Sequence, residues 1–159
     1  MTAQVQETIV IDGIPVALLT NPLDDFLERF LDGPRFESTS TALWRGYIGT
    51  WELTNSRFYL IELTGLLTTG LEASLETIFP GYPDRVFAHW YTGTLRIPKG
   101  RRIKYVHMGY GSEFEIDHFI RIERGEAVTS WVRENGTAPD GAPDYYGPAA
   151  MLVPPKPLR

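Results

Sequence analysis

The feature that most constrains the fold is a strict alternation of apolar and polar side chains in residues 113–123. The even positions from Phe114 to Ile122 are apolar apart from His118, and the odd positions are charged apart from Phe119. Successive side chains of a β-strand point to opposite faces, so this alternation predicts a strand with one buried and one solvated face. A strand of this kind requires a sheet with a core on one side.

Further runs of branched and aromatic residues have strand character, and sequences typical of turns separate them. The pairs Asp12-Gly13 and Asn55-Ser56 fit tight hairpin turns. Connections this short favour antiparallel pairing, and we therefore expect one curved, mainly antiparallel sheet. The expected strands cover residues 7–19 (as a hairpin), 44–53, 58–64, 86–97, 103–108, 113–123 and 127–132.

Two helices are expected to cover this sheet. Residues 22–32 predict an amphipathic helix, with Asn21 as its N-cap, Pro22 in its first turn and Gly33 at its end. A second, shorter helix is expected at residues 71–79. The sequence therefore predicts an α+β fold in one domain, residues 1–134, because chains of this length seldom divide.

Residues 135–159 differ in composition from the rest of the chain. They contain six of the twelve prolines, which excludes a helix or a central strand. Apolar residues among the prolines favour an extended arm that packs on its own sheet or on that of a neighbour. Crossing to a neighbour would make the protein a homo-oligomer.

Composition excludes several classes of protein. Hydrophobic residues at 43% and charged residues at 22% exclude a disordered or fibrous chain. The absence of cysteine excludes disulfides, thiolate metal sites and a cysteine nucleophile. No apolar run is long enough for a membrane span, and no signal-peptide pattern precedes the first strand, so a cytoplasmic location without membrane contact is expected.

The negative charge is concentrated near the N-terminus. The formal net charge is −5, and the first 33 residues hold six acidic residues against one basic residue. Asp24, Asp25, Glu28 and Asp32 would share the outer face of the first helix. Carboxylates in its first turn suit the helix dipole, but Asp32 in the last turn opposes it. This face is the predicted docking surface for a protein partner with a basic surface.

A ligand pocket is the first alternative. Residues 47–53 contain Gly49-Thr50-Trp51, which resembles the first-strand signature of lipocalins and fatty-acid-binding proteins. That resemblance implies a ligand-holding barrel with Trp51 at the floor of its cavity. The residues expected to line such a pocket are Trp51, Trp90, Tyr91, His107 and Tyr110.

Catalysis by His107 is the second alternative. His107 precedes a glycine-spaced loop, and Glu113 or Glu115 could complete an acid–base pair with it. The three histidines are too far apart for a helical metal motif, and no cofactor or metal site is predicted. The bases between Lys99 and Lys104 come without an aromatic platform, so no nucleic-acid partner is expected.

The leading hypothesis from the sequence is a small non-enzymatic binding module that docks a macromolecule through the acidic helix face. Microbial immunity proteins and inhibitors of basic toxins share this profile of small size, acidic face and no catalytic signature. The assignment to that class is an analogy.

Overall fold

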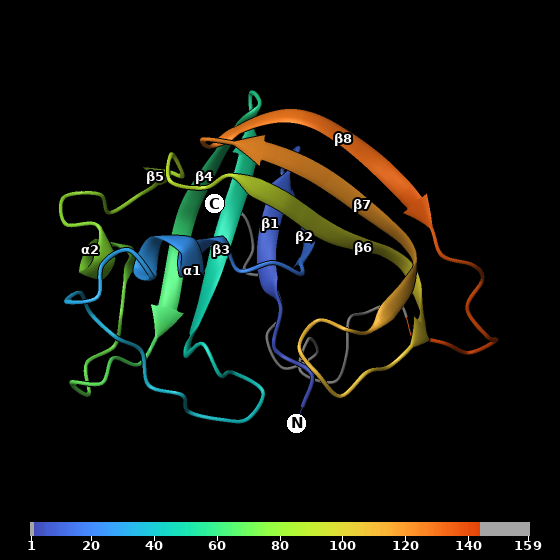
Figure 1. Ribbon diagram of the computed structural model, residues 1–159, viewed down its shortest axis with the longest axis horizontal. Helices are drawn as coiled ribbons and strands as arrows, with labels where there is room; N and C mark the ends of the chain where they lie inside the picture. Colours follow the sequence, from blue (N-terminus) through green and yellow to red (C-terminus); the bar gives the residue numbers. More distant parts are fainter. Residues whose placement is uncertain (1, 144–159) are drawn as a thin grey trace.

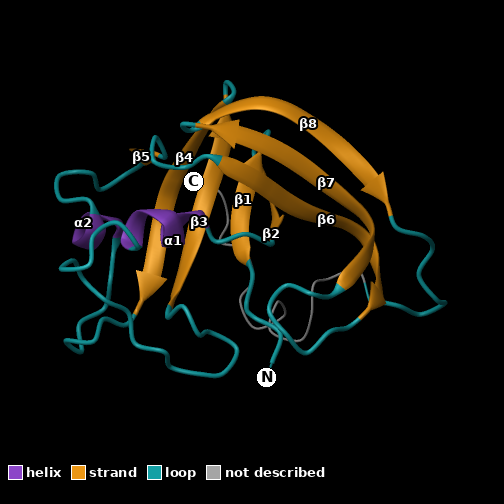
Figure 2. Ribbon diagram, viewed as in Figure 1, coloured by secondary structure: helices purple, strands orange, loops and turns teal. Residues whose placement is uncertain are grey.

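The computed structural model describes residues 2–143, in which eight strands form one sheet and two short helices lie beside it (Figures 1 and 2). This sheet-rich architecture with few helices is compatible with the predicted α+β class. The strands are β1 (Glu7–Ile11), β2 (Ile14–Leu18), β3 (Tyr47–Thr54), β4 (Arg57–Gly65), β5 (Val86–Phe87), β6 (Gly93–Lys104), β7 (Glu113–Glu123) and β8 (Glu126–Glu134); the helices are α1 (Pro22–Leu27) and α2 (Leu75–Ile78).

The sheet is mainly antiparallel, as the sequence predicted, but it is mixed because one pair of strands is parallel. The strand order is β2-β1-β3-β4-β8-β7-β6, with β5 paired to β4. Its neighbours are antiparallel except β1 and β3, which run parallel with Ile9 beside Trp51. The connection from β2 to β3 includes α1 and is long enough for the chain to cross over β1, as a parallel pair requires.

The sheet curves until its two outer strands meet. The N–H of Leu19, just after β2, donates a hydrogen bond of 2.9 Å to the carbonyl of Arg96 in β6. In Figure 1, β6, β7 and β8 form long curved arms across one end of β1, β3 and β4. On the opposite side, β4 and β8 share a single residue pair, Arg57 with Glu126, so most of β8 lies at an edge of the sheet that the described residues form.

The predicted hairpin turns are confirmed. Asp12 and Gly13 have φ values of 51° and 77°, and Asn55 and Ser56 have values of 50° and 61°. Positive φ at both central residues defines the turn whose twist matches a two-residue hairpin. The predicted β1–β2 and β3–β4 hairpins therefore form at the expected places.

The first helix is shorter than predicted. It ends at Leu27, not at residue 32, and the N–H of Phe30 bonds to the carbonyl of Leu27 in a tighter turn. Leu31 is 79% exposed, so the second half of the predicted apolar stripe has no core to pack on. Without that burial, a short helix lacks the packing that stabilises it.

The second helix is also shorter than predicted. It covers residues 75–78, where residues 71–79 were expected. The N–H of Leu67 bonds to the carbonyl of Leu71, which places Leu71 in a loop. The N–H of Ser74 donates to the Thr77 hydroxyl at 2.9 Å, and this local bond marks the helix start.

A core rich in aromatic residues fills the curved sheet. Trp51 stacks on Phe58 with ring centres 4.7 Å apart. The indole N–H of Trp90 donates to the carbonyl of Pro22 at 3.0 Å, and Phe26 of α1 contacts Phe79 just after α2. These contacts attach both helices to the same side of the sheet (Figure 2).

The first part of the proline-rich arm packs on its own domain. The Asn135 amide donates to the carbonyl of Phe114, and the N–H of Ala138 donates to Glu115. The carbonyl of Pro143 accepts from the N–H of Arg102. The rest of the predicted arm, residues 144–159, lies outside the described residues, and so does the predicted crossing to a neighbouring chain.

No helix within residues 2–143 is long and apolar enough to span a membrane.

Candidate functional site

The four acidic residues predicted to share a helix face lie in different environments. Asp24 is half-buried, and its carboxylate accepts a hydrogen bond of 2.5 Å from the Tyr47 hydroxyl. Asp25 is also half-buried, whereas Glu28 and Asp32 are exposed, and Asp32 lies in the turn beyond α1. The structure therefore does not present the four carboxylates on one exposed helix face.

The aromatic residues predicted to line a pocket are mostly core residues. Trp51, Trp90 and Tyr91 are buried in the main hydrophobic cluster. Burial raises the pKa of Tyr91 to about 12. Because Trp51 is completely covered and stacked on Phe58, it packs in the core and does not line a cavity floor.

His107 and Tyr110 lie in the loop between β6 and β7 but have different roles. His107 is exposed and stands edge-on to Tyr105, with no carboxylate of residues 2–143 within ion-pair distance. The Tyr110 hydroxyl donates to the Asn21 side chain at 2.5 Å. Asn21 is the N-cap residue of α1, as predicted, but its side chain makes no capping hydrogen bond. Glu115 accepts hydrogen bonds from the N–H groups of Arg101 and Ala138 and is likewise not paired with His107.

A pocket of about 480 Å³ lies between α1, the segment that follows it and the start of β3. We call it the Arg45 pocket. Four apolar side chains and the stems of longer ones form its walls, and the polar groups gather near Arg45. It is lined by Gln4, Asn21, Asp24, Leu27, Pro34, Arg35, Phe36, Trp44, Arg45 and Tyr47.

Local hydrogen bonds hold Arg45 in this position. The Gln4 side chain accepts from the N–H of Trp44 and donates to the carbonyl of Thr41, both at 2.8 Å. Gly46 follows with φ +78°, and a Cβ there would lie 2.5 Å from the Glu37 carbonyl. Only glycine lets the chain turn this close to that backbone, and the turn leads Arg45 into β3.

Arg45 forms a buried ion pair with Glu7 of β1. The Nη2 atom of Arg45 lies 2.9 Å from the Glu7 carboxylate, and only 6% of the Arg45 side chain is exposed. The backbone N–H of Gly49 and the indole N–H of Trp51 also donate to Glu7, at 2.6 and 3.2 Å. Burial nevertheless raises the pKa of Glu7, and these contacts only partly oppose the rise.

Two nitrogen atoms of Arg45 have no hydrogen-bond partner. Nε and Nη1 are both buried, and no acceptor of residues 2–143 satisfies either of them. Burial acts to lower the pKa of Arg45, but the charge and hydrogen bond of Glu7, together with Tyr110 and Tyr47, raise it above its usual value, so the guanidinium keeps its charge. Buried charged donors without acceptors are costly, and native structures keep few of them.

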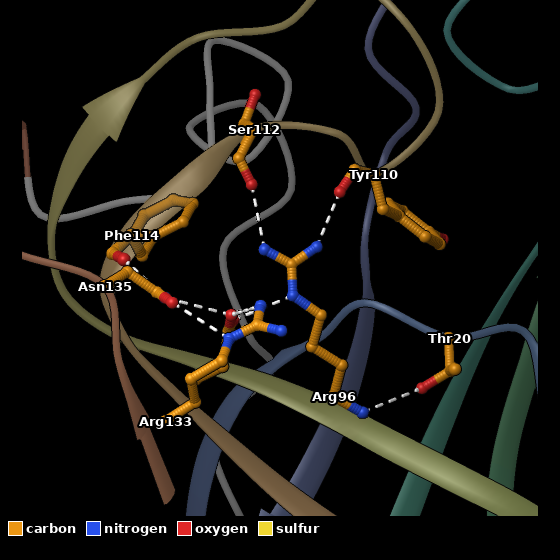
Figure 3. Close-up of polar contacts among 8 residues, drawn as sticks. Thr20, Arg96, Tyr110, Ser112, Phe114, Arg133 and Asn135 are labelled. Atoms are coloured by element: carbon orange, nitrogen blue, oxygen red, sulfur yellow. Dashed lines mark hydrogen bonds and ion pairs between the residues drawn. The ribbon is translucent and has the colours of Figure 1, made fainter.

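A second buried carboxylate, Asp117 of β7, has hydrogen bonds to both of its oxygen atoms. Figure 3 shows its partners Arg96, Arg133 and Asn135. Asp117 accepts from Arg96 Nε at 2.8 Å, Arg133 Nη2 at 2.7 Å and Asn135 Nδ2 at 3.0 Å. The remaining nitrogens of Arg96 donate to the carbonyls of Tyr110 and Ser112. Burial acts to raise the pKa of Asp117, but these hydrogen bonds lower it below the usual range.

The two buried carboxylates therefore differ in whether the arginine paired with each has all of its hydrogen-bond partners. At Asp117 every hydrogen-bonding group of Arg96 has a partner, and the site fastens the β6–β7 loop and the segment after β8 to the sheet. At Glu7 the paired arginine retains unsatisfied donors beside a pocket. The Asp117 site is structural, and the Arg45 pocket is the candidate functional site.

The remaining surface offers fewer signs of a site. A hollow of about 610 Å³ lies at the β7–β8 turn, lined only by exposed side chains such as Arg124 and Glu126. Within residues 2–143, no group of three or more histidines and carboxylates could hold a metal ion.

Sequence reasoning singled out Asp24 of this pocket but missed Glu7 and Arg45. One signal was available: Val5, Glu7 and Ile9 occupy alternate positions, so Glu7 interrupts an apolar row. Comparison with protein-family models, with curated proteins and with solved structures finds no match to the chain. The functional argument therefore depends on the pocket itself.

Proposed function

We propose that the protein binds a small molecule in the Arg45 pocket and that an acceptor oxygen of this ligand pairs with the Arg45 guanidinium. The observation that carries the proposal is a side chain 94% buried, charged and short of two hydrogen-bond acceptors, in the wall of a pocket of about 480 Å³. A ligand oxygen would supply what the protein lacks. Hydrogen bonds to a charged group contribute about 1.5–3 kcal/mol.

The rest of the pocket supports a ligand with an apolar body. Leu27, Phe36 and Trp44 supply apolar surface, and Trp44 is half exposed at the rim. Pockets for small molecules combine such walls with a few convergent polar groups. We infer that a flat or aliphatic body lies against Trp44 while a carboxylate, phosphate or carbonyl oxygen meets Arg45.

Asp24 adds a preference on the other side of the ligand. Its carboxylate already accepts from Tyr47, and an oxygen of a carboxylate has room for further donors. A ligand hydroxyl or amine could donate to Asp24 while its acceptor oxygen meets Arg45. The pocket thus supports a ligand that carries both an acceptor and a donor group.

Native mass spectrometry of the freshly purified protein tests this proposal. The expected result is the 18.0 kDa chain with an additional retained mass that collision activation removes. In Arg45→Lys the ammonium keeps a charge beside Glu7 but loses the Nε and Nη1 donors. At about 1.4 kcal/mol per tenfold, the loss of even one such hydrogen bond corresponds to a roughly 10- to 150-fold loss of affinity, so the retained mass should disappear.

The matched control is Arg101→Lys, the same substitution at an arginine outside the pocket. It should keep the retained mass of the wild type. Thermal unfolding of both variants shows that each is folded. Equal ligand retention by Arg45→Lys and the wild type, or no retained mass and no response to probe ligands, would contradict the proposal.

A second candidate function is docking of a macromolecule with a basic surface. The exposed residues of the segment after α1 support it. Phe30 and Leu31 are exposed between the exposed carboxylates Glu28 and Asp32. The exposed base Arg29 lies in the same segment, and the net charge of the segment is negative. Exposed apolar side chains beside a net charge are typical of protein-docking surfaces. This surface keeps two of the four acidic residues that the sequence analysis proposed.

Charge reversal tests this second function. The double variant Glu28→Lys and Asp32→Lys should lose a partner that the wild type captures in a salt-sensitive way, because both side chains are exposed. Glu123→Lys, an exposed carboxylate on β7, is the control and should capture the partner normally. Equal capture by the double variant would exclude this surface.

A further inference from the structure

The outer edge of β8 is a long strand edge without a pairing partner. On this side β8 pairs with β4 only at Glu126, and the N–H of Ala127 bonds to the carbonyl of Ser56. From Val128 to Glu134, no strand of residues 2–143 lies beside this edge. In Figure 1, β8 runs along the rim of the molecule with β7 on one side only.

The segment of this edge from Thr129 to Glu134 lacks several features that usually prevent edge-to-edge pairing. It contains no proline and no lysine, and the β-bulge of β8 against β7 falls before it, at Val128. By contrast, the edge strand β2 carries Pro15 and is covered at its end by β6. Val128, Trp131 and Val132 of β8 expose between 45% and 60% of their surface.

The charges of β8 make its free segment complementary to itself when two copies run antiparallel. Arg133 and Glu134 stand together at one end, and the other end, from Val128 to Ser130, is neutral. Antiparallel pairing places the charged end of each copy against the neutral end of the other. Like charges therefore do not face each other, and directly opposed like charges are what destabilises such pairs.

One antiparallel register of the two β8 strands gives the most favourable pairs of opposing side chains. With Val132 opposite the same residue of the second copy, Trp131 lies opposite Arg133 and Ser130 opposite Glu134, each pair occurring twice by symmetry. The Val132 pair buries apolar surface, the guanidinium of Arg133 meets an aromatic ring, and the Ser130 hydroxyl can donate to the carboxylate. Arg133 already lies over the Phe119 ring at 5.1 Å, so it is held on the face that Trp131 shares.

We propose that β8 is a self-association surface on which a second copy of this chain adds its own β8 antiparallel, forming a symmetric dimer centred on Val132. The occupant is a second copy because an isologous interface requires one surface to complement itself, and this edge does so in backbone, apolar surface and charge. The proposal is independent of the Arg45 pocket, because β8 contributes no residue to that pocket.

Cysteine substitution tests the register directly, since the chain has no cysteine of its own. In the proposed dimer the two Val132 Cα atoms lie about 4.5–5.5 Å apart, within the range that a disulfide spans. Val132→Cys should therefore form a disulfide-linked dimer under mild oxidation. Val128→Cys is the matched control, because the two copies of residue 128 would be eight residues out of register, roughly 27 Å apart.

Light scattering of the full chain supplies the second arm. The wild type should approach twice its chain mass of 18.0 kDa as its concentration rises. Val132→Lys places two like charges at the centre and should remain a monomer, whereas Leu71→Lys, on an exposed loop residue outside every proposed surface, should dimerise normally.

Three results would overturn the proposal. One is a wild-type mass of 18.0 kDa at every concentration up to the solubility limit. Another is a dimer that Val132→Lys leaves intact, which would place the interface elsewhere. The third is equal cross-linking of Val128→Cys and Val132→Cys, which would indicate random collision or another occupant of the edge.

Discussion

Replacement of Asp117 by asparagine tests the assignment of the Asp117 site as structural. The carboxylate accepts from Arg96, Arg133 and Asn135, and an asparagine would keep one acceptor oxygen while its amide faces a donor. Arg96 is 20% exposed, so loss of this charge-assisted bond costs about 1.5–3 kcal/mol. Arg133 is 60% exposed, and its pair with Asp117 contributes only about 0.2–1 kcal/mol.

The expected cost of Asp117→Asn is thus about 2–4 kcal/mol near neutral pH. Urea unfolding followed by tryptophan fluorescence should show the midpoint falling by about 1–2 M, for a slope of about 2 kcal/mol per M. The control is Glu123→Gln on the same strand, where both partners of a 3.9 Å pair with Arg121 are exposed. It should change the stability by less than about 1 kcal/mol.

The pH dependence of this cost gives an independent check. The pKa of Asp117 in the folded protein is below its usual value of 3.8, so the stability it contributes is present above pH 3.8 and is lost as the pH falls through the folded value. The difference between the wild type and Asp117→Asn should therefore narrow in acid. A cost below about 1 kcal/mol, or a difference that widens in acid, would refute the reasoning.

Three further substitutions give sharp expectations. Glu7→Gln should cost less than Asp117→Asn in urea unfolding, because burial raises the pKa of Glu7; the stability associated with that raised pKa is present below pH 4.5 and is lost as the pH rises through the folded value. Gly125→Ala should lower the free energy of unfolding by about 1–3 kcal/mol, measured in the same way, because φ is +84° and the new Cβ would lie 2.7 Å from the Phe87 ring. His107→Ala should leave the thermal midpoint and any retained ligand unchanged, because His107 is exposed and does not line the Arg45 pocket.

The elements that depend on local interactions could be predicted from the sequence. The alternation around Ile120 and the positive-φ pair Asp12-Gly13 act over a few residues, and both the β7 strand and the first hairpin form as expected. The end of α1 depends on tertiary packing, because the helix ends where its apolar side chains no longer contact the core. Leu31 continues the helical stripe in the sequence, but no part of the described structure covers it.

Pairing between distant strands could not be predicted either. The parallel contact of β1 with β3 joins Ile9 to Trp51, which are far apart in sequence, and no local pattern encodes this neighbour. Periodicity identifies a strand but not its partner. The sequence therefore predicted the mainly antiparallel sheet but not its one parallel pair, β1 with β3.

The candidate site could not be predicted for both of these reasons, because it depends on which strands pair and on which residues the core buries. Glu7 and Arg45 are 38 residues apart and meet only because β1 and β3 are neighbours. The sequence placed Asp24 on an outer helix face, but its hydrogen-bond partner is Tyr47, on a strand that the sequence did not connect to α1. Charged residues read singly in a sequence suggest solvated positions, and only the assembled sheet reveals which of them are buried.

The most direct test of the proposed ligand site is the NMR signal of the Arg45 Nε–H group, identified by its absence in Arg45→Lys. This group is buried without an acceptor in the structure. Titration with benzoate, phenyl phosphate and benzamide offers a carboxylate, a phosphate and a carbonyl oxygen on the same flat body. We expect at least one probe to shift this signal saturably, together with the indole signal of Trp44 at the pocket rim. An Arg45 signal that all three probes leave unchanged would contradict the proposed ligand site.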